Sequence, residues 1–308
     1  DGNALYKYSY NFQNWYPSAE FETKNTVQNV GLYELTPFSK FELKGEKIYD
    51  ELQKICTANI KNEIGKCTYT QMLNSDGGIE TDLTVVCISD KHFRIIGGAA
   101  TRERDKFHIK KHINPNIELS DVTDEYVCLG VFGPKSRALM NEISNDDFSN
   151  ENFKFSCSKN VSIVNKNVWV QRLSYVGEVG YELYIKFTEA KSVFDQIMNI
   201  GKKYNLSLCG AHAMDILRME SGFLHWGHDI SPEENQLQAG LKFAISFKKN
   251  FNFVGKEAIS KINQTEVKKK FIMLTLDNAK PGEPLALHFE PIYIDGKISG
   301  NTTSANYS

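Results

Sequence analysis

The stretch Tyr175-Val-Gly-Glu-Val-Gly-Tyr-Glu182 places a carboxylate beside a glycine turn at the start of a strand-like run. About a hundred residues earlier, Gly77-Gly-Ile-Glu-Thr-Asp82 has a similar arrangement. A carboxylate that a fold buries needs hydrogen-bond donors or positive charge from a partner. The two stretches therefore predict that Asp82 and Glu182 meet around one polar heterocycle.

The composition argues against several classes of function. The chain has 308 residues, of which 41% are hydrophobic, so it can bury a sizeable core in two or three domains. A formal net charge of −2 without basic blocks favours neither a nucleic-acid partner nor a membrane surface. No apolar run approaches the roughly 20 residues that span a bilayer, and the N-terminus has no signal-peptide pattern.

The six cysteines lie far apart and form no C-x-x-C site. We expect them to be reduced core residues of a cytoplasmic or mitochondrial-matrix protein, without structural zinc. The sequence also lacks G-x-G-x-x-G and P-loop motifs, so it carries no recognisable site of its own for FAD, NAD or ATP. No Ser-His-Asp or Cys-His grouping stands out.

Periodicity predicts an α+β chain with largely antiparallel sheets, rather than a doubly wound parallel sheet. Strands are expected at 32–35, 41–44, 83–88, 93–96, 126–132, 168–175, 181–187, 271–276 and 291–298. Helices are expected after Gly45 and at 134–140, 189–204, 210–221 and 254–262. Residues 1–30 are expected to be an extended lead-in, 145–160 a surface loop and 265–270 a charged linker, while 232–242 are ambiguous.

Both carboxylates have structural alternatives. Asp82 follows a glycine turn and begins an apolar strand, where it either serves a ligand or bonds its own backbone. Within Tyr181–Phe187, Glu182 shares a face with Tyr184 and Lys186. That face either lines a cavity or meets solvent.

Two more candidates lie downstream. Arg218 either clamps an anion or pairs at the surface with Asp215 or Glu220. His225-Trp-Gly-His-Asp229 offers part of a metal site, but its glycine breaks a helix and no third histidine is near. We expect no metal there, and instead a tight turn that presents Trp226 to a pocket.

Four motifs in order resemble the glycine-cleavage T-protein (aminomethyltransferase) family: Gly78-Ile-Glu-Thr-Asp-Leu83, Tyr175–Glu182, Leu217-Arg-Met-Glu-Ser-Gly222 and Trp226-Gly-His-Asp-Ile230. The flanking stretches 35–45, 69–74 and 93–100 resemble the folate-binding C-terminal half of FAD-dependent dimethylglycine and sarcosine dehydrogenases. The resemblance runs from about residue 30 to the end of the chain.

This resemblance implies a T-protein-like folate-binding fold, with three subdomains around a central cavity. Residues 31–255 would form the folate-binding domain from two subdomains, and 265–308 an incomplete C-terminal β-barrel. Because the chain begins without Met and ends where the family continues, we expect a fragment of a longer polypeptide or one subunit of a split enzyme. FAD would lie on the missing N-terminal half or a partner subunit, and an electron-carrier flavoprotein is a further candidate partner.

The resemblance also implies residue roles around tetrahydrofolate. Glu182 would hold the pterin edge as a bidentate acceptor, and Asp82 would lie beside the nitrogens that take up the one-carbon unit. Arg218 would lie near the substrate or folate. The remaining folate contacts would be the aromatic residues Tyr175, Trp226, Tyr69 and Phe38, the last of which stands where many T-proteins have Met.

The implied function is tetrahydrofolate-dependent one-carbon transfer in a dimethylglycine or sarcosine dehydrogenase-like enzyme. Oxidation of an N-methyl amine yields an iminium carbon, which folate captures as 5,10-methylenetetrahydrofolate, while Asp82 accepts a proton or stabilises positive charge. Three alternatives stay open: a free-standing aminomethyltransferase, a methyl-transferring relative such as a dimethylsulfoniopropionate demethylase, and a non-catalytic folate-binding scaffold.

Overall fold

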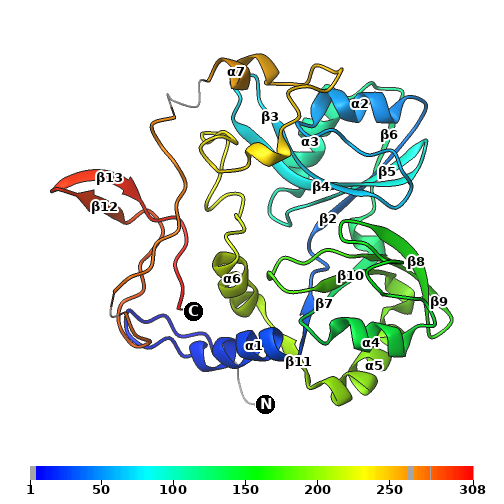
Figure 1. The fold of residues 1–308 in the computed structure, drawn as a ribbon, viewed down its shortest axis with the longest axis horizontal. Coiled ribbons are helices and arrows are strands. Elements are labelled where there is room, and N and C mark those ends of the chain that lie inside the picture. Colours follow the sequence, from blue (N-terminus) through cyan, green and yellow to red (C-terminus); the bar gives the residue numbers. More distant parts are fainter. Residues whose placement is uncertain (1–4, 263–266, 278, 308) are drawn as a thin grey trace.

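The computed structural model describes residues 5–262, 267–277 and 279–307 and confirms a mixed α+β chain with two large sheets (Figure 1). Residues 1–4 of the expected lead-in and 265–266 of the expected linker lie outside the described residues. None of the helices in the described ranges combines the length and hydropathy of a membrane span.

The first sheet has six strands in the order β11-β1-β7-β10-β9-β8. These strands are β1 (Val30–Glu34), β7 (Tyr126–Phe132), β8 (Ser158–Ile163), β9 (Lys166–Gln171), β10 (Gly180–Lys186) and β11 (Leu206–Cys209). All neighbours pair antiparallel except β1 and β11, which run parallel. The helices α4 (Ser136–Ile143) and α5 (Ala190–Gly201) pack apolar side chains onto its outer face, where they join strand residues such as Val170 and Leu183 in one cluster.

The second sheet has five antiparallel strands in the order β3-β4-β5-β2-β6. They are β2 (Ser39–Lys44), β3 (Cys67–Leu73), β4 (Ile79–Ser89), β5 (His92–Gly97) and β6 (Glu118–Asp121). Its outer face is covered by α2 (Ile48–Ile55) and α3 (Arg102–His112), which contribute Leu52 and Ile109 to one apolar cluster. In the chain, this whole sheet is inserted between β1 and β7.

The two sheets turn their more polar faces toward each other. Ile96 of the five-stranded sheet packs in one cluster with Trp169 and Tyr126 of the six-stranded sheet. Arg94 also crosses between the sheets, because its guanidinium lies 4.7 Å above the Tyr126 ring and donates to the Tyr126 hydroxyl at 3.4 Å. Since strand residues alternate between faces, the polar positions of each sheet lie on the face that is turned toward the other sheet.

The helix α6 (Ala211–Glu220) adds Ala213 and Leu217 to the apolar cluster on the inner face of the six-stranded sheet. Short 3₁₀ turns span 123–125, 187–189, 202–204 and 242–244. The remaining elements are α1 (Tyr16–Gln28), α7 (Lys256–Lys261), β12 (Pro291–Ile294) and β13 (Lys297–Asn301).

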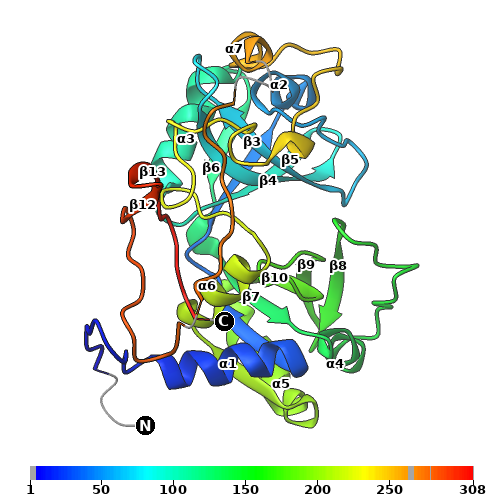
Figure 2. The same ribbon diagram turned by 60° about the vertical axis from the view of Figure 1, so that its left-hand side comes forward.

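The expected extended lead-in was wrong for residues 16–28, which form α1. A proline in the first turn suits this helix start, because its fixed φ fits and its missing N–H is not needed there. Only Ala19 and Thr26 of the helix are buried, so its sequence shows little apolar periodicity. The helix contacts α6, β11 and β1, and Figure 2 shows α1 next to α6. Its first residue, Tyr16, meets Tyr307 near the other end of the chain.

The expected strand at 271–276 was also wrong, because these residues have no regular structure. Its apolar side chains, including Met273 and Leu276, are exposed. Of the expected barrel, the described residues contain the β12–β13 hairpin, whose two strands pair only with each other. The expected loop at 145–160 ends early, since β8 begins at Ser158.

Candidate functional site

Asp82 lies on β4 opposite Gln71 of β3, on the inner face of the five-stranded sheet. The Gln71 amide donates to Asp82 Oδ1 at 2.6 Å, and the Gln236 amide in turn donates to Gln71 Oε1. Burial raises the pKa of Asp82 to about 6, although the Gln71 and Tyr69 side chains lower it. Such a carboxyl exchanges protons near neutral pH and suits a general base.

The glycine turn before Asp82 has a packing reason. A Cβ on Gly78 would lie 1.8 Å from the carbonyl oxygen of Pro232, so only glycine permits this approach. The Ile79 N–H then donates to the Glu234 carbonyl at 2.9 Å. These contacts dock the segment that carries Gln236 against the turn, and so complete the hydrogen-bond chain to Asp82.

Glu182 lies on β10, on the inner face of the six-stranded sheet. Its Oε2 accepts the Tyr184 hydroxyl at 2.8 Å, and Tyr184 is only 1% exposed. Glu182 and Tyr184 therefore face the interior, whereas Lys186 at the end of the strand is exposed. Burial raises the pKa of Glu182, while the Tyr184 hydroxyl and the Lys40 ammonium lower it.

Electrostatic influence links the two sheets across this interior. Burial is the main cause that raises the pKa of Tyr69 and Tyr175, and the charge of Asp82 adds to that rise. Burial also raises the pKa of Cys67 on β3, and the charge of Glu182 adds a smaller effect. We call this region the inter-sheet site, and its polar side chains are Tyr69, Gln71 and Asp82 on one sheet and Gln171, Glu182 and Tyr184 on the other.

Three of the predicted aromatic residues lie around this interior. The Tyr175 hydroxyl donates to the Leu224 carbonyl at 2.6 Å, and its ring stacks on Phe223 at 5.8 Å. Tyr69 stacks on Phe243 at 6.2 Å and remains 37% exposed. Phe38 packs in the inner-face cluster with Trp169.

Arg218 is committed to partners within the chain. It is 2% exposed, and its nitrogens donate to Asp229 at 2.5 Å, Asp215 at 2.8 Å and Ser304 at 2.7 Å. The alternative pairing with Asp215 is present, but in a buried setting rather than at the surface. A guanidinium with these bonds joins α6, the 225–229 turn and the C-terminal segment, and leaves no free face for an anion.

Trp226 lies in the expected tight turn, where Gly227 adopts a φ of +91°. Its indole N–H donates to the Ile79 carbonyl at 3.0 Å, and the Arg104 guanidinium lies 5.0 Å from its ring. Trp226 thus packs beside the start of β4. Throughout the described part of the chain, no group of three or more His, Cys, Asp or Glu residues could hold a metal ion.

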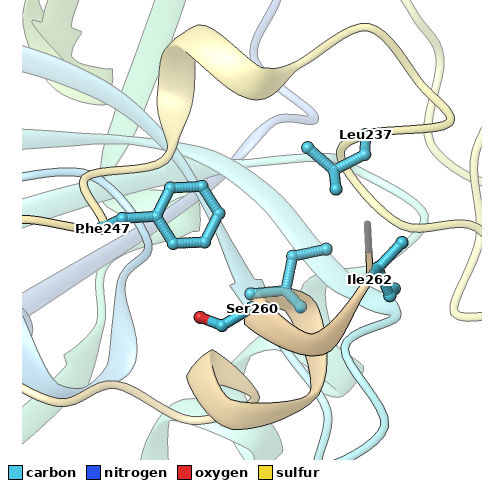
Figure 3. A pocket seen from close by; sticks show the side chains of 5 residues that line it. Leu237, Phe247, Ser260 and Ile262 are labelled. Atoms are coloured by element: carbon cyan, nitrogen blue, oxygen red, sulfur yellow. The ribbon is translucent and has the colours of Figure 1, made fainter. Parts of the chain in front are cut away.

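A separate pocket of about 250 Å³ lies at α7 (Figure 3). It is lined by Leu237, Phe247, Ile259, Ser260 and Ile262. The Ser260 hydroxyl is its one polar side-chain group, so this pocket lacks the carboxylates that a polar heterocycle needs.

The motifs did not reveal the glutamines Gln71, Gln171 and Gln236, which are all fully buried. Gln71 stands inside the recognised stretch 69–74, and strand alternation from Asp82 could have assigned it to the inner face. Gln236 lies in an irregular segment, where no periodicity points to it.

The chain is similar to known proteins in both its sequence and its fold. Residues 3–249 match the GCVT N-terminal domain family. The chain is 35% identical over 306 residues to a 4-methylaminobutanoate oxidase (formaldehyde-forming) of Paenarthrobacter nicotinovorans, covering 99% of this chain and 37% of that protein. It is 32% identical over 311 residues to the mitochondrial dimethylglycine dehydrogenase of Homo sapiens, covering 99% and 35%.

The chain thus spans little more than a third of the length of these two relatives. Among solved structures, the glycine cleavage system aminomethyltransferase T from Bartonella henselae superposes with a TM-score of 0.71 at 20% identity. That match covers 84% of this chain and 70% of the other, and it confirms the expected T-protein-like fold. This chain therefore belongs to the GCVT N-terminal domain family.

Proposed function

We propose that this chain is the tetrahydrofolate-dependent one-carbon transfer module of an enzyme that resembles dimethylglycine or sarcosine dehydrogenase. The observation that carries the proposal is the pair of inner-face carboxylates, Asp82 and Glu182, on facing sheets. Asp82, whose pKa is raised to about 6, suits proton transfer. Glu182, with one oxygen held by Tyr184, suits recognition of a polar ring.

The residues of the inter-sheet site fit a pterin. Among the described residues, Glu182 Oε1 has no hydrogen-bond partner, so this oxygen remains available to a neighbouring N–H. Lys40, whose ammonium lowers the pKa of Glu182, favours the ionised carboxylate that accepts such bonds. Tyr175 and Tyr69 offer aromatic surfaces for the ring and its tail.

Tetrahydrofolate supplies the two nitrogens that take up the carbon. In the net transfer, an iminium carbon forms bonds to both nitrogens, its bond to the amine breaks, and the two N–H protons leave. One proton goes to the departing amine, and we assign the other to Asp82. Exclusion of water from the inter-sheet site during transfer would keep the carbon from being released as formaldehyde.

The oxidation that produces the iminium needs a flavin, and we propose that FAD is held by another part of a longer protein or by a partner subunit. The two oxidoreductase relatives, which are almost three times as long as this chain, support this arrangement. A free-standing aminomethyltransferase is the second candidate, and it is favoured by the fold shared with the Bartonella henselae protein.

The test is Asp82→Asn in the complete natural polypeptide. This change keeps the shape of the side chain but removes the base, so formation of 5,10-methylenetetrahydrofolate should fall by at least about 100-fold. Tetrahydrofolate affinity, measured by titration calorimetry, should stay within about tenfold, because Asp82 serves transfer rather than binding.

The matched control is Asp76→Asn, which changes an exposed aspartate in the β3–β4 turn. It should leave both affinity and turnover at the level of the unchanged protein. Turnover by Asp82→Asn close to that level would show that Asp82 is not the base. Absence of tetrahydrofolate binding by the unchanged protein would remove the proposal altogether.

A further inference from the structure

Gln171, the last residue of β9, is a buried amide that the fold leaves without partners. Its exposed fraction is 0%, and neither Oε1 nor Nε2 has a hydrogen-bond partner among the described residues. A buried polar group left unpaired costs about 1–3 kcal/mol, so proteins rarely retain one without a use. We therefore expect the Gln171 amide to form hydrogen bonds with a ligand.

The strand register places Gln171 next to Glu182. The two residues are cross-strand partners of β9 and β10, so their side chains emerge on the same face. The neighbouring pair on that face is Trp169 and Tyr184, which pack in the inner-face cluster. Val170, between Trp169 and Gln171, packs into the outer core instead.

The same face carries a second unmatched donor. The indole N–H of Trp169 is buried and has no partner among the described residues. Two consecutive inner-face residues of β9 thus hold unpaired polar atoms toward the inter-sheet site. This local concentration fits a polar ligand that lies along β9 and β10 better than an isolated packing defect.

The hydrogen-bonding groups of Glu182 and Gln171 indicate which edge of a ligand ring the two side chains would bind. An ionised Glu182 only accepts hydrogen bonds, whereas the Gln171 amide both donates and accepts. Together they match a ring on which N–H donors stand next to a carbonyl oxygen. The 4-oxo pterin has this sequence: its 2-amino group and ring N–H face a carboxylate, and its carbonyl needs a donor.

We propose that Gln171 is a specificity-determining residue whose amide donates to the ring carbonyl beside the N–H edge held by Glu182. This assignment rests on the proposed function and deepens it, because it selects 4-oxo pterins over rings that lack the carbonyl. Gln171 contacts the ligand ring and takes no part in proton transfer.

The experiment compares Gln171→Met with the unchanged protein, both as the complete natural polypeptide. Methionine has a similar length and no hydrogen-bonding amide. Tetrahydrofolate affinity, measured by calorimetry, should fall about 10- to 100-fold because the ring carbonyl loses its donor. 4-Deoxytetrahydrofolate lacks that carbonyl and with it the adjacent ring N–H, so both proteins should bind it more weakly than tetrahydrofolate, and equally within about threefold.

Thermal unfolding without ligand separates this role from a structural one. Gln171→Met should melt at the same temperature as the unchanged protein or higher, because it removes an unpaired buried amide. The control Gln53→Met should melt lower, since the Gln53 amide donates to Asn59 and to the Ile60 carbonyl at 3.0 Å each.

The outcomes separate the two proposals. If the unchanged protein does not bind tetrahydrofolate, the proposed function fails and the role of Gln171 fails with it. If the unchanged protein binds and Glu182→Gln loses binding, while Gln171→Met binds normally, only the Gln171 assignment is overturned. A lower melting temperature together with unchanged affinity would also overturn it, in favour of a structural glutamine.

Discussion

At the scale of single residues, Asp82 owes its chemistry to neighbours on two other segments. Burial raises its pKa to about 6, and the side chains of Gln71 and Tyr69 oppose that rise. Gln71 donates to Asp82 and accepts from Gln236, in a relay of two fully buried amides. Each amide orients the next, because an amide that donates at one end presents its oxygen at the other. The proton affinity of Asp82, the proposed base, therefore depends on neighbours that Gln236 helps to orient.

This relay predicts a pH dependence. In the proposed transfer, Asp82 acts as an ionised base, so the rate should rise with pH through an inflection near 6 and then level off. Gln71→Met removes the donor that lowers this pKa, so its inflection should move above 6. The measurement is the pH profile of the transfer rate at saturating folate, with Gln53→Met as a control. An inflection that stays in place or moves down would contradict the relay.

The sequence motifs located both carboxylates but missed the glutamines that serve them. A strand with polar residues on one face has the same pattern whether that face meets solvent or a polar interior. The run 181–187 therefore left cavity and solvent open for Glu182, and only the packing of two sheets decides between them. The pairing of Arg218 with Asp215 follows from their spacing on one helix, but its partners Asp229 and Ser304 come from segments whose approach no local pattern encodes.

At the scale of elements, α3 carries a buried acid on the outer face of the five-stranded sheet. Asp105 is 0% exposed, and its Oδ2 accepts the Thr101 hydroxyl at 2.6 Å. Burial raises its pKa to about 7, against a smaller lowering by the Thr101 hydroxyl and the Arg104 guanidinium. The folded chain therefore holds this carboxyl largely protonated below neutral pH.

The raised pKa of Asp105 links the stability of the folded chain to pH. Because the folded pKa lies above the unfolded value, the stabilisation is complete below about pH 4 and is lost as pH rises through about 7. This group should lower the free energy of unfolding by roughly 1.4 kcal/mol between pH 6 and pH 8. Asp105→Asn should abolish that part of the slope in denaturant titrations at the two pH values.

The matched control is Glu103→Gln, which changes an exposed acid on the same helix. Its difference in stability between pH 6 and pH 8 should equal that of the unchanged protein. Equal slopes for Asp105→Asn and the unchanged protein would show that Asp105 is ionised in the folded state. The sequence did not predict this helix. Most of its residues are charged and few are buried, so its sequence shows little apolar periodicity.

At the scale of the whole molecule, hydroxyl groups of the C-terminal segment form hydrogen bonds with the 225–229 turn. Thr303 and Ser304 donate to Asp229 Oδ1 at 2.5 and 2.8 Å, and Arg218 holds the other oxygen of that carboxylate. Hydrogen bonds to a charged group are among the stronger ones in proteins. Distant parts of the chain thus share one buried ion pair.

Replacing both hydroxyls, as Thr303→Val with Ser304→Ala, should loosen the C-terminal segment while the two sheets keep their fold. We expect a loss of about 2–4 kcal/mol in local stability, seen as faster hydrogen exchange in the β12–β13 hairpin. The control is Ser299→Ala on β13. Among the described residues the Ser299 hydroxyl bonds only the Lys297 carbonyl, so this change should alter exchange little. Unchanged exchange in the double variant would show that other contacts hold the segment.

The parallel pairing of β1 with β11 has a consequence for synthesis on the ribosome. Val30 pairs with Leu206, which is synthesised 176 residues later. One edge of β1 therefore has no partner strand for roughly 10–35 s at ordinary elongation rates. In that interval the inserted five-stranded sheet, complete once residue 121 has emerged, can already form. We expect the nascent chain to fold from the inside outward, with the last-made edge strand closing the sheet that the first-made strand began.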